Sequence, residues 1–283
     1  MGAKNYRTTN VGVFGHPIDE NPTVVLQEAG FRELGLNYRY LNFDIKQGEL
    51  ENALNAIKVL GFRGINLTIP HKVDIIPFLD SISDAAKKIE AVNTVVIEGG
   101  KLFGENTDGK GFIQSITTDA GCSPRGAHAV ILGAGGAARA IAVELILAGA
   151  SQLTIVNRSK NRGQALVELL KRNCGFDSEF KIWDNTYKPP DCDFLVNATS
   201  INLYPDASKP DIHYEAIAPG TIVCDVIPNP PQTGFLTEAK KRGAVTLDGL
   251  GMLVYQGAIG FKLWTGLDAP VDVMRKALQE EFS

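Results

Sequence analysis

The stretch that decides the fold is Val130-Ile-Leu-Gly-Ala-Gly-Gly-Ala-Ala-Arg139, an apolar run that ends in a glycine-rich turn. Further along the chain a second apolar run, Leu153 to Val156, ends in the polar residues Asn157-Arg-Ser159. Strand, glycine turn, helix and second strand follow one another in this order in a dinucleotide-binding unit. The two stretches therefore predict such a unit in the second half of the chain.

The small residues of the turn have separate tasks in a unit of this kind. Gly133 permits the tight turn, and Gly135 lets backbone N–H groups come close to a pyrophosphate. A helix that starts near Gly136 points its positive end at the phosphates, and Ala138 takes the small-residue position where helix packs on strand. We expect Gly133, Gly135, Gly136 and Ala137 to contact the cofactor.

The end of the second strand indicates which dinucleotide binds. An NAD site usually has Asp or Glu there to hold the ribose 2′-hydroxyl, but this chain has Asn157 and Arg158, with Arg162 one helical turn later. Two guanidinium groups suit a 2′-phosphate, which they can hold bidentately. We predict NADP as the cofactor. The alternative is that both arginines are solvated residues at a helix start.

Composition bounds the remaining possibilities. The chain has 283 residues, of which 44% are hydrophobic and 21% charged, so it can form one large or two ordinary domains with a substantial core. The net charge of −4 and the scattered basic residues argue against nucleic acid as a partner. No apolar run is long enough for a membrane span, and the N-terminus lacks the apolar core of a signal peptide. We expect a cytoplasmic protein, a monomer or a homodimer, that acts on a small molecule.

The cysteines and histidines show no metal-binding pattern. The four cysteines are Cys122, Cys174, Cys192 and Cys224, and no two of them form a Cys-x-x-Cys pair. Since none of the four histidines stands at ligand spacing from a cysteine, we predict free thiols and no metal site.

Apolar runs alternate with helical patterns along the chain, which predicts an α/β protein with mostly parallel sheets. In the first part we expect strands at Asn10–Phe14, Tyr38–Asp44, Gly64–Leu67, Thr94–Glu98 and Lys101–Gly104, and helices at Pro22–Leu34, Gly48–Leu60, Lys72–Leu79 and Ser83–Ile89. In the Rossmann-like part we expect strands at 128–132, 152–156, 179–183, 193–197, 221–225 and 244–246. We assign 1–108, completed by 247–283, to a substrate domain and 109–246 to the NADP domain, with the last helices packing back on the first domain.

Two charged residues stand where polar segments follow predicted strands. Lys72 comes at the start of a helix, after Pro70, where the helix dipole disfavours a cation and so prepares the lysine for proton transfer. Asp108 opens the helix that runs to about Thr118. Each residue alone has an ordinary structural explanation, a solvated lysine and a helix cap. Together in one cleft they would make a proton-handling pair.

The chain resembles the shikimate dehydrogenase family over nearly its whole length. The matching segments, in the family's order, are Gly64-Ile-Asn-Leu-Thr-Ile-Pro-His-Lys72, Ala91-Val-Asn-Thr94, Asn106-Thr-Asp-Gly109, Gly133-Ala-Gly-Gly-Ala-Ala138, Asn157-Arg-Ser159, Val196-Asn-Ala-Thr-Ser200 and Gly249-Leu-Gly-Met-Leu-Val-Tyr-Gln256. The resemblance implies reversible, NADP-dependent reduction of 3-dehydroshikimate to shikimate, with Lys72 transferring the proton and Asp108 as its partner. It implies further substrate contacts from Asn66, Thr68, Asn93 and Gln256. It also implies cofactor contacts from Asn157, Arg158, Ser159, Arg162, Thr199 and Met252.

One end of the implied substrate site departs from the family. Two serines usually follow the first strand and hold the substrate carboxylate, but this chain has Asp19-Glu-Asn-Pro-Thr23 there. A tyrosine that also touches the carboxylate is replaced by Pro228. Asn21 and Thr23 are the candidates to hold a carboxylate instead. The alternatives are a dehydrogenase for quinate or another cyclic polyol, including one without a carboxylate, and a non-catalytic NADP-binding regulator.

Overall fold

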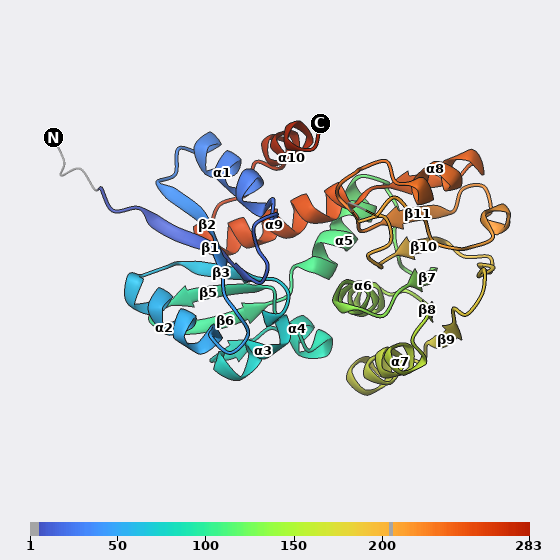
Figure 1. Ribbon diagram of the computed structural model, residues 1–283, viewed down its shortest axis with the longest axis horizontal. Coiled ribbons are helices and arrows are strands. Elements are labelled where there is room, and N and C mark those ends of the chain that lie inside the picture. The colour runs from blue at the N-terminus through green and yellow to red at the C-terminus, as the bar shows by residue number, and fades with distance from the viewer. Residues whose placement is uncertain (1–5, 204–205) are drawn as a thin grey trace. The chain divides into compact units, whose positions relative to one another are not determined.

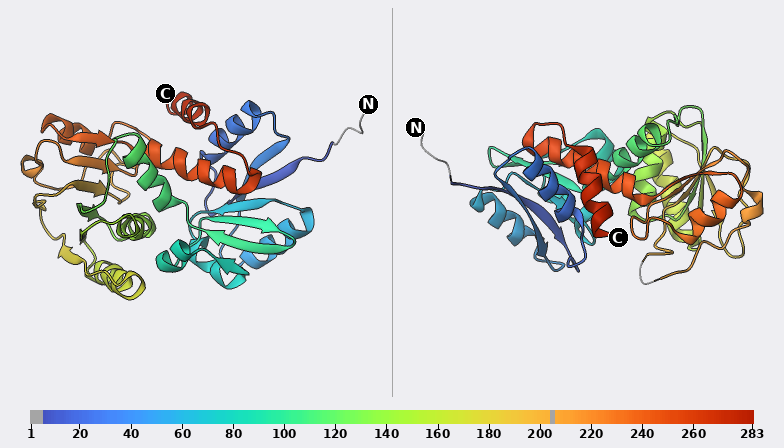
Figure 2. Two further views of the ribbon diagram at one scale, coloured as in Figure 1. Left: turned by 180° about the vertical axis from the view of Figure 1, so that it is seen from behind. Right: turned by 90° about the horizontal axis from the view of Figure 1, so that it is seen from above.

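The computed structural model describes residues 6–203 and 206–283, which form two compact units. The first unit contains the chain up to Thr107 together with Gly257–Glu281, and the second contains Asp108–Gln256. Both are α/β structures built on a six-stranded sheet. Figures 1 and 2 show the strands and helices of each unit.

The first sheet has the order β2-β1-β3-β5-β6-β4. Its strands are β1 (Thr9–Gly15), β2 (Tyr38–Asp44), β3 (Gly64–Leu67), β4 (Ser81–Ile82), β5 (Thr94–Glu98) and β6 (Lys101–Glu105). β1 runs parallel to β2 and β3, whereas β5 pairs antiparallel with both β3 and β6. The β5–β6 turn is Gly99-Gly100, where both residues have positive φ, as a two-residue hairpin requires.

Helices cover both faces of the first sheet. They are α1 (Thr23–Glu33), α2 (Leu50–Leu60), α3 (His71–Asp74), α4 (Asp84–Ile89), the last part of α9 (Gly249–Thr265) and α10 (Val271–Glu281), with a 3₁₀ turn at Ile76–Phe78. Phe31 of α1 stacks on Phe261 of α9 at 5.2 Å between ring centroids, and Trp264 donates a hydrogen bond to the Val95 carbonyl. The chain from Gly257 onward therefore completes the core of the first unit.

The predicted helix at Lys72–Leu79 is wrong in its length. α3 ends at Asp74 and a separate 3₁₀ turn follows. The reason is Pro77, which has no N–H for a helical hydrogen bond and whose ring would clash with the carbonyl four residues earlier. Consequently Lys72 lies in a helix of a single turn.

The second sheet is parallel throughout, in the order β12-β11-β10-β7-β8-β9. Its strands are β7 (His128–Leu132), β8 (Gln152–Asn157), β9 (Glu179–Ile182), β10 (Phe194–Asn197), β11 (Ile222–Asp225) and β12 (Val245–Leu247). Its helices are α5 (Asp108–Thr118), α6 (Gly136–Leu147), α7 (Lys160–Cys174) and α8 (Gly234–Lys241), with a 3₁₀ turn at Tyr214–Ala216. The strand order reverses between β7 and β10, which is where open parallel sheets bind ligands.

Within residues 6–203 and 206–283, none of the helices has the length and apolar character needed to cross a membrane. In the same ranges no group of three or more histidine, cysteine or acidic side chains is placed to hold a metal ion.

Candidate functional site

In the first unit, the predicted substrate residues Asn66 and Asn93 belong to one buried hydrogen-bond network. Asn66 Nδ2 donates to the Asn93 carbonyl at 3.0 Å and to Thr94 Oγ1 at 2.9 Å. Asn93 Nδ2 donates to Thr107 Oγ1 at 2.9 Å, and the Thr107 N–H donates back to Asn93 Oδ1 at 2.7 Å. All four side chains are buried. The network therefore joins the end of β3 to the residues on either side of the β5–β6 hairpin.

Lys72 is held beside this network through its backbone. Its carbonyl accepts a hydrogen bond from the Val92 N–H at 2.8 Å, one residue before Asn93. The turn that carries it is anchored by His71, whose buried ring is hydrogen-bonded to the Ile45 carbonyl and whose N–H donates to the Thr68 carbonyl. Thr68 follows β3 directly and its N–H donates to the Phe14 carbonyl. The Lys72 side chain itself is half-buried.

Asp108 follows Thr107 directly in the chain and is the first residue of α5. This helix packs closely within the second unit, because a Cβ on Gly109 would collide with the Ala140 carbonyl of α6. A Cβ on Gly111 would lie 2.6 Å from the Gln256 nitrogen and 2.7 Å from the Met252 oxygen of α9. The two glycines thus let α5 approach both helices, and they fix the backbone that carries Asp108.

The predicted substrate residue Gln256 is buried on α9, where its Nε2 donates to the Leu253 carbonyl at 3.0 Å. Met252 lies one turn earlier on the same helix and is partly exposed.

The loop that replaces the family's two serines is an ordered turn. Asn21 Oδ1 accepts the Thr23 N–H at 3.0 Å, and the Asn21 carbonyl accepts Asn42 Nδ2 at 3.1 Å. Thr23 is only 6% exposed, whereas Asp19 and Glu20 are both exposed. Thr23 therefore belongs to the interior of the unit.

Tyr40 extends the buried network, although the sequence did not predict it as a site residue. Its phenol donates to Asn66 Oδ1 at 2.7 Å, and burial raises its pKa well above the ordinary value. In the sequence Tyr40 belongs to an apolar strand, so only its hydroxyl distinguishes it from a core residue. Thr94 and Thr107 were not predicted either, and in the sequence only their hydroxyl groups distinguish them from core residues.

In the second unit, the glycine turn has the predicted shape. Gly133 has φ +113, and a Cβ there would lie 2.8 Å from the Ala198 carbonyl and 3.1 Å from the Thr199 side chain. Gly135 precedes α6 as its N-cap, and Gly136 and Ala137 begin the helix. Gly135 and Gly136 are exposed, and an added Cβ at either would meet nothing within 4 Å. The turn therefore offers open backbone at the N-terminus of a helix.

The polar residues after β8 form a capped helix start. Asn157 Nδ2 donates to the Ser159 carbonyl at 2.9 Å, and Ser159 Oγ accepts the Arg162 N–H at 3.4 Å. Arg158 and Arg162 are both exposed. Arg158 lines a cavity of about 440 Å³ whose wall includes Trp183 and Ser200. This arrangement leaves both guanidinium groups accessible to an anionic ligand.

A buried carboxylate next to the glycine turn was not predicted. Asp225, at the end of β11, accepts hydrogen bonds from Asn197 Nδ2 at 3.0 Å and from the Thr233 hydroxyl at 2.8 Å. Burial raises its pKa from 3.8 to about 6, although these hydrogen bonds lower it. Asn197 Oδ1 in turn accepts the Thr199 hydroxyl at 2.6 Å. The cluster thus positions Thr199, a predicted cofactor residue.

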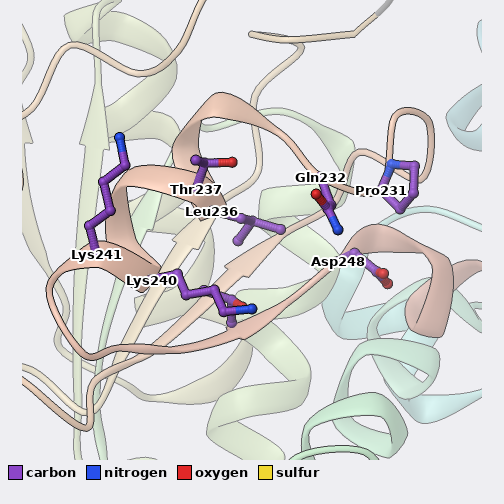
Figure 3. A pocket seen from close by; sticks show the side chains of 8 residues that line it. Pro231, Gln232, Leu236, Thr237, Lys240, Lys241 and Asp248 are labelled. Atoms are coloured by element: carbon purple, nitrogen blue, oxygen red, sulfur yellow. The ribbon is translucent and has the colours of Figure 1, made fainter.

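Another cavity of the second unit contains none of the predicted residues. It has a volume of about 450 Å³ and lies beside α8 and β12 (Figure 3). Its lining residues are Pro231, Gln232, Leu236, Thr237, Lys240, Lys241, Thr246 and Asp248. Lys241 donates to Glu238 of the same helix at 2.9 Å.

Three family models match the chain. Residues 13–95 match the shikimate dehydrogenase substrate-binding domain, 117–200 match shikimate/quinate 5-dehydrogenase, and 249–279 match the shikimate 5′-dehydrogenase C-terminal domain. The matched segments contain the glycine turn, Lys72 and Gln256.

Relatives match over nearly the whole chain. The NADP(+) shikimate dehydrogenase of Desulforamulus reducens is 40% identical, over 99% of this chain and 97% of its own. The ligand-free 5-ketofructose reductase of Gluconobacter sp. strain CHM43 is 45% identical with a TM-score of 0.94, covering 98% of this chain and 100% of that one. A shikimate dehydrogenase solved with NADP+ is 36% identical with a TM-score of 0.89, covering 99% and 97%.

Proposed function

Because the chain belongs to the shikimate dehydrogenase family, and so is an NADP-dependent oxidoreductase, we propose that it reversibly reduces a ketone with a hydroxyl group on an adjacent carbon. In this proposal residues 1–108 with 247–283 hold the substrate, and 109–246 hold the cofactor. The single observation that supports it best is the buried Asn66–Asn93 network, which places polar side chains beside the backbone of Lys72.

Lys72 and Asp108 have the proton-handling roles in this proposal. The Lys72 ammonium polarises the carbonyl oxygen and gives it a proton during reduction, and takes the proton back during alcohol oxidation. Asp108 accepts a hydrogen bond from a neighbouring substrate hydroxyl and orients the lysine. The network around Asn66 and Asn93 keeps the surrounding amides fixed, so that they need not reorganise during the reaction.

The second unit would bind NADP through features that fit the cofactor. The open backbone at Gly135 and Gly136 suits the pyrophosphate, and exposed Arg158 and Arg162 suit the 2′-phosphate. When bound, NADPH supplies the hydride. Thr199 and Met252 would complete the cofactor contacts. Asn157 and Ser159 keep the loop that carries Arg158 in place.

Two substrates are candidates. The names of the curated relatives favour 3-dehydroshikimate, whose reduction gives shikimate. The name of the structural neighbour favours 5-ketofructose, a sugar ketone without a carboxyl group. A specific feature supports the second candidate: no serine stands between Gly15 and Thr23, and Pro228 replaces the tyrosine at the carboxylate end.

The test is the absorbance of NADPH with purified protein and 3-dehydroshikimate, 5-ketofructose or 3-dehydroquinate in parallel. Oxidation of NADPH by any of the three supports the proposal, and NADH serves as the cofactor control. Absence of turnover with all three ketones, while NADPH still binds by fluorescence, would contradict it. The variant Lys72→Met provides the background rate for a protein without the proton donor.

A further inference from the structure

The cavity beside α8 and β12 contains none of the side chains that the proposed function places against substrate or cofactor (Figure 3). Its volume of about 450 Å³ lies within the range of small-molecule sites in proteins. One wall is a single face of α8, because Leu236, Thr237, Lys240 and Lys241 include pairs three or four residues apart on this helix. The other lining residues come from the loop before α8, from β12 and from the residue that follows β12.

The two lysines of this wall differ in what they contact. Lys241 donates to Glu238 at 2.9 Å, so its charge is already paired on α8. Lys240 is exposed and forms no ion pair with any residue that the structure describes. Figure 3 shows Lys240 extending in the direction of Gln232 and Asp248, whereas the Lys241 ammonium points the other way. Lys240 therefore gives the cavity an ammonium group that is available to an anion.

Three uncharged polar side chains of the cavity are also available. Gln232, Thr237 and Thr246 form no side-chain hydrogen bond within residues 6–203 and 206–283. Each of them can donate a hydrogen bond to an oxygen atom. Leu236, which is only 6% exposed, and Pro231 add apolar surface to the lining. The lining thus suits a ligand that has charged oxygens at one end and an apolar body.

The acidic residue among the described lining residues is Asp248. Its Oδ1 accepts the Leu250 N–H at 3.1 Å at the start of α9, and in Figure 3 its carboxylate points away from Lys240. Asp248 therefore leaves the Lys240 ammonium open to a ligand. Because one ammonium group balances one negative charge and an unbalanced charge is costly to desolvate, a carboxylate fits better than a doubly charged phosphate.

We propose that this cavity is a second binding site, specific for a small carboxylate with an apolar body. The Lys240 ammonium pairs with the carboxylate, and Gln232, Thr237 and Thr246 donate to its oxygens. Leu236 contacts the apolar body. The inference does not depend on the proposed function, because binding at this cavity is measured without any turnover.

The test is a titration of the isotope-labelled full chain with benzoate, followed through the NMR shifts of the backbone amides. Wild type should show saturable shifts at Thr237 and Thr246. Lys240→Gln should raise the Kd for benzoate about tenfold, the size of one hydrogen bond to a charged group. Lys241→Gln is the matched control, since it removes the neighbouring charge from the same helix, and it should change this Kd by less than about twofold.

Two further measurements separate the carboxylate contact from other causes. Benzamide has the shape of benzoate without its charge, so its Kd should be at least about tenfold higher. Lys240→Arg keeps the charge, so it should bind benzoate within about threefold of wild type. The amide spectrum of each variant also shows directly that the protein is folded.

Three results would overturn the inference. The first is the absence of saturable shifts at Thr237 and Thr246 in wild type. The second is an equal loss of affinity in Lys240→Gln and Lys241→Gln, which would mean that benzoate responds only to the basic surface of α8. The third is equal binding of benzamide and benzoate, which would mean that the cavity does not recognise the charge.

Discussion

In the proposed function, the two units would bind their ligands through different groups. The first has buried side chains that satisfy one another, from Tyr40 through Asn66 to Asn93. The second has exposed backbone at Gly135 and Gly136 and an exposed guanidinium at Arg158. The difference teaches that the proposed cofactor site can be recognised from local sequence, whereas the proposed substrate site depends on contacts between distant segments.

The largest effect should come from Lys72→Met. If Lys72 of the first unit donates the proton, kcat should fall about a thousandfold, a typical loss for a general acid. The second unit is untouched, so the Kd for NADPH, measured by fluorescence, should stay at the wild-type value. A parallel loss of NADPH affinity would show that the two tasks are not separated between the units.

The buried carboxylate of the second unit should make its stability depend on pH. The folded-state pKa of Asp225 is about 6, raised by burial from 3.8, so the folded state holds the proton more tightly. The stability that protonation provides is complete below pH 3.8 and is lost as pH rises through about 6. A shift of about two pKa units corresponds to roughly 3 kcal/mol.

Comparison with Asp225→Asn isolates this effect. The free energy of unfolding of wild type, relative to the variant, should decline by up to that amount between pH 4 and 7. Urea titrations at several pH values measure it. Parallel curves for the two proteins would mean that Asp225 does not titrate in this range. The first-unit network around Tyr40 has no group that titrates between pH 4 and 7. The difference in free energy of unfolding between wild type and Tyr40→Phe should therefore stay constant over this range.

Alanine substitutions at two glycines of the same turn should have different effects, one on protein stability and the other on NADPH binding. Gly133→Ala places a side chain at φ +113 and 2.8 Å from a carbonyl, so it should lower the free energy of unfolding by about 2 kcal/mol. Gly135→Ala meets nothing in the protein, so its stability should stay at wild type while NADPH binding weakens. Thermal unfolding and NADPH fluorescence measure the two effects. Equal destabilisation by both substitutions would contradict the account of the turn.

The smallest effect should come from the exposed arginine. Arg158→Leu removes one charged contact to the 2′-phosphate, so the Kd for NADPH should rise about tenfold. The Kd for NADH should be unchanged because NADH has no such phosphate. KM for the ketone, which belongs to the first unit, should also stay constant. An equal loss for both cofactors would assign Arg158 a role other than phosphate recognition.

Much of the fold follows from local sequence. The strands at Tyr38–Asp44, Gly64–Leu67, Thr94–Glu98 and His128–Leu132 have the predicted bounds, because apolar runs between polar turns define them well. The glycine turn was also predictable, since only glycine tolerates the backbone of Gly133. The helix predicted at Lys72–Leu79 is wrong in its length, because Pro77 cannot continue an α-helix and a separate 3₁₀ turn forms there.

The site was only partly predictable. Residues in short motifs, such as Asn66 and Asn93, could be named from the sequence. Tyr40 could not, because its partner Asn66 is far away in the chain, and the pairing of β1 with both β2 and β3 brings the two residues close. Asp225 was visible in the sequence, but its burial, and therefore its raised pKa, depends on tertiary packing.

The central claim is tested most directly by the substrate preference of the wild-type protein. We would measure NADPH oxidation with 5-ketofructose and with 3-dehydroshikimate at matched concentrations and compare kcat/KM. The account predicts a preference for 5-ketofructose of at least about tenfold, because no serine stands between Gly15 and Thr23 and Pro228 replaces the tyrosine at the carboxylate end. A higher kcat/KM for 3-dehydroshikimate would contradict it and would mean that the loop at Asn21–Thr23 binds a carboxylate.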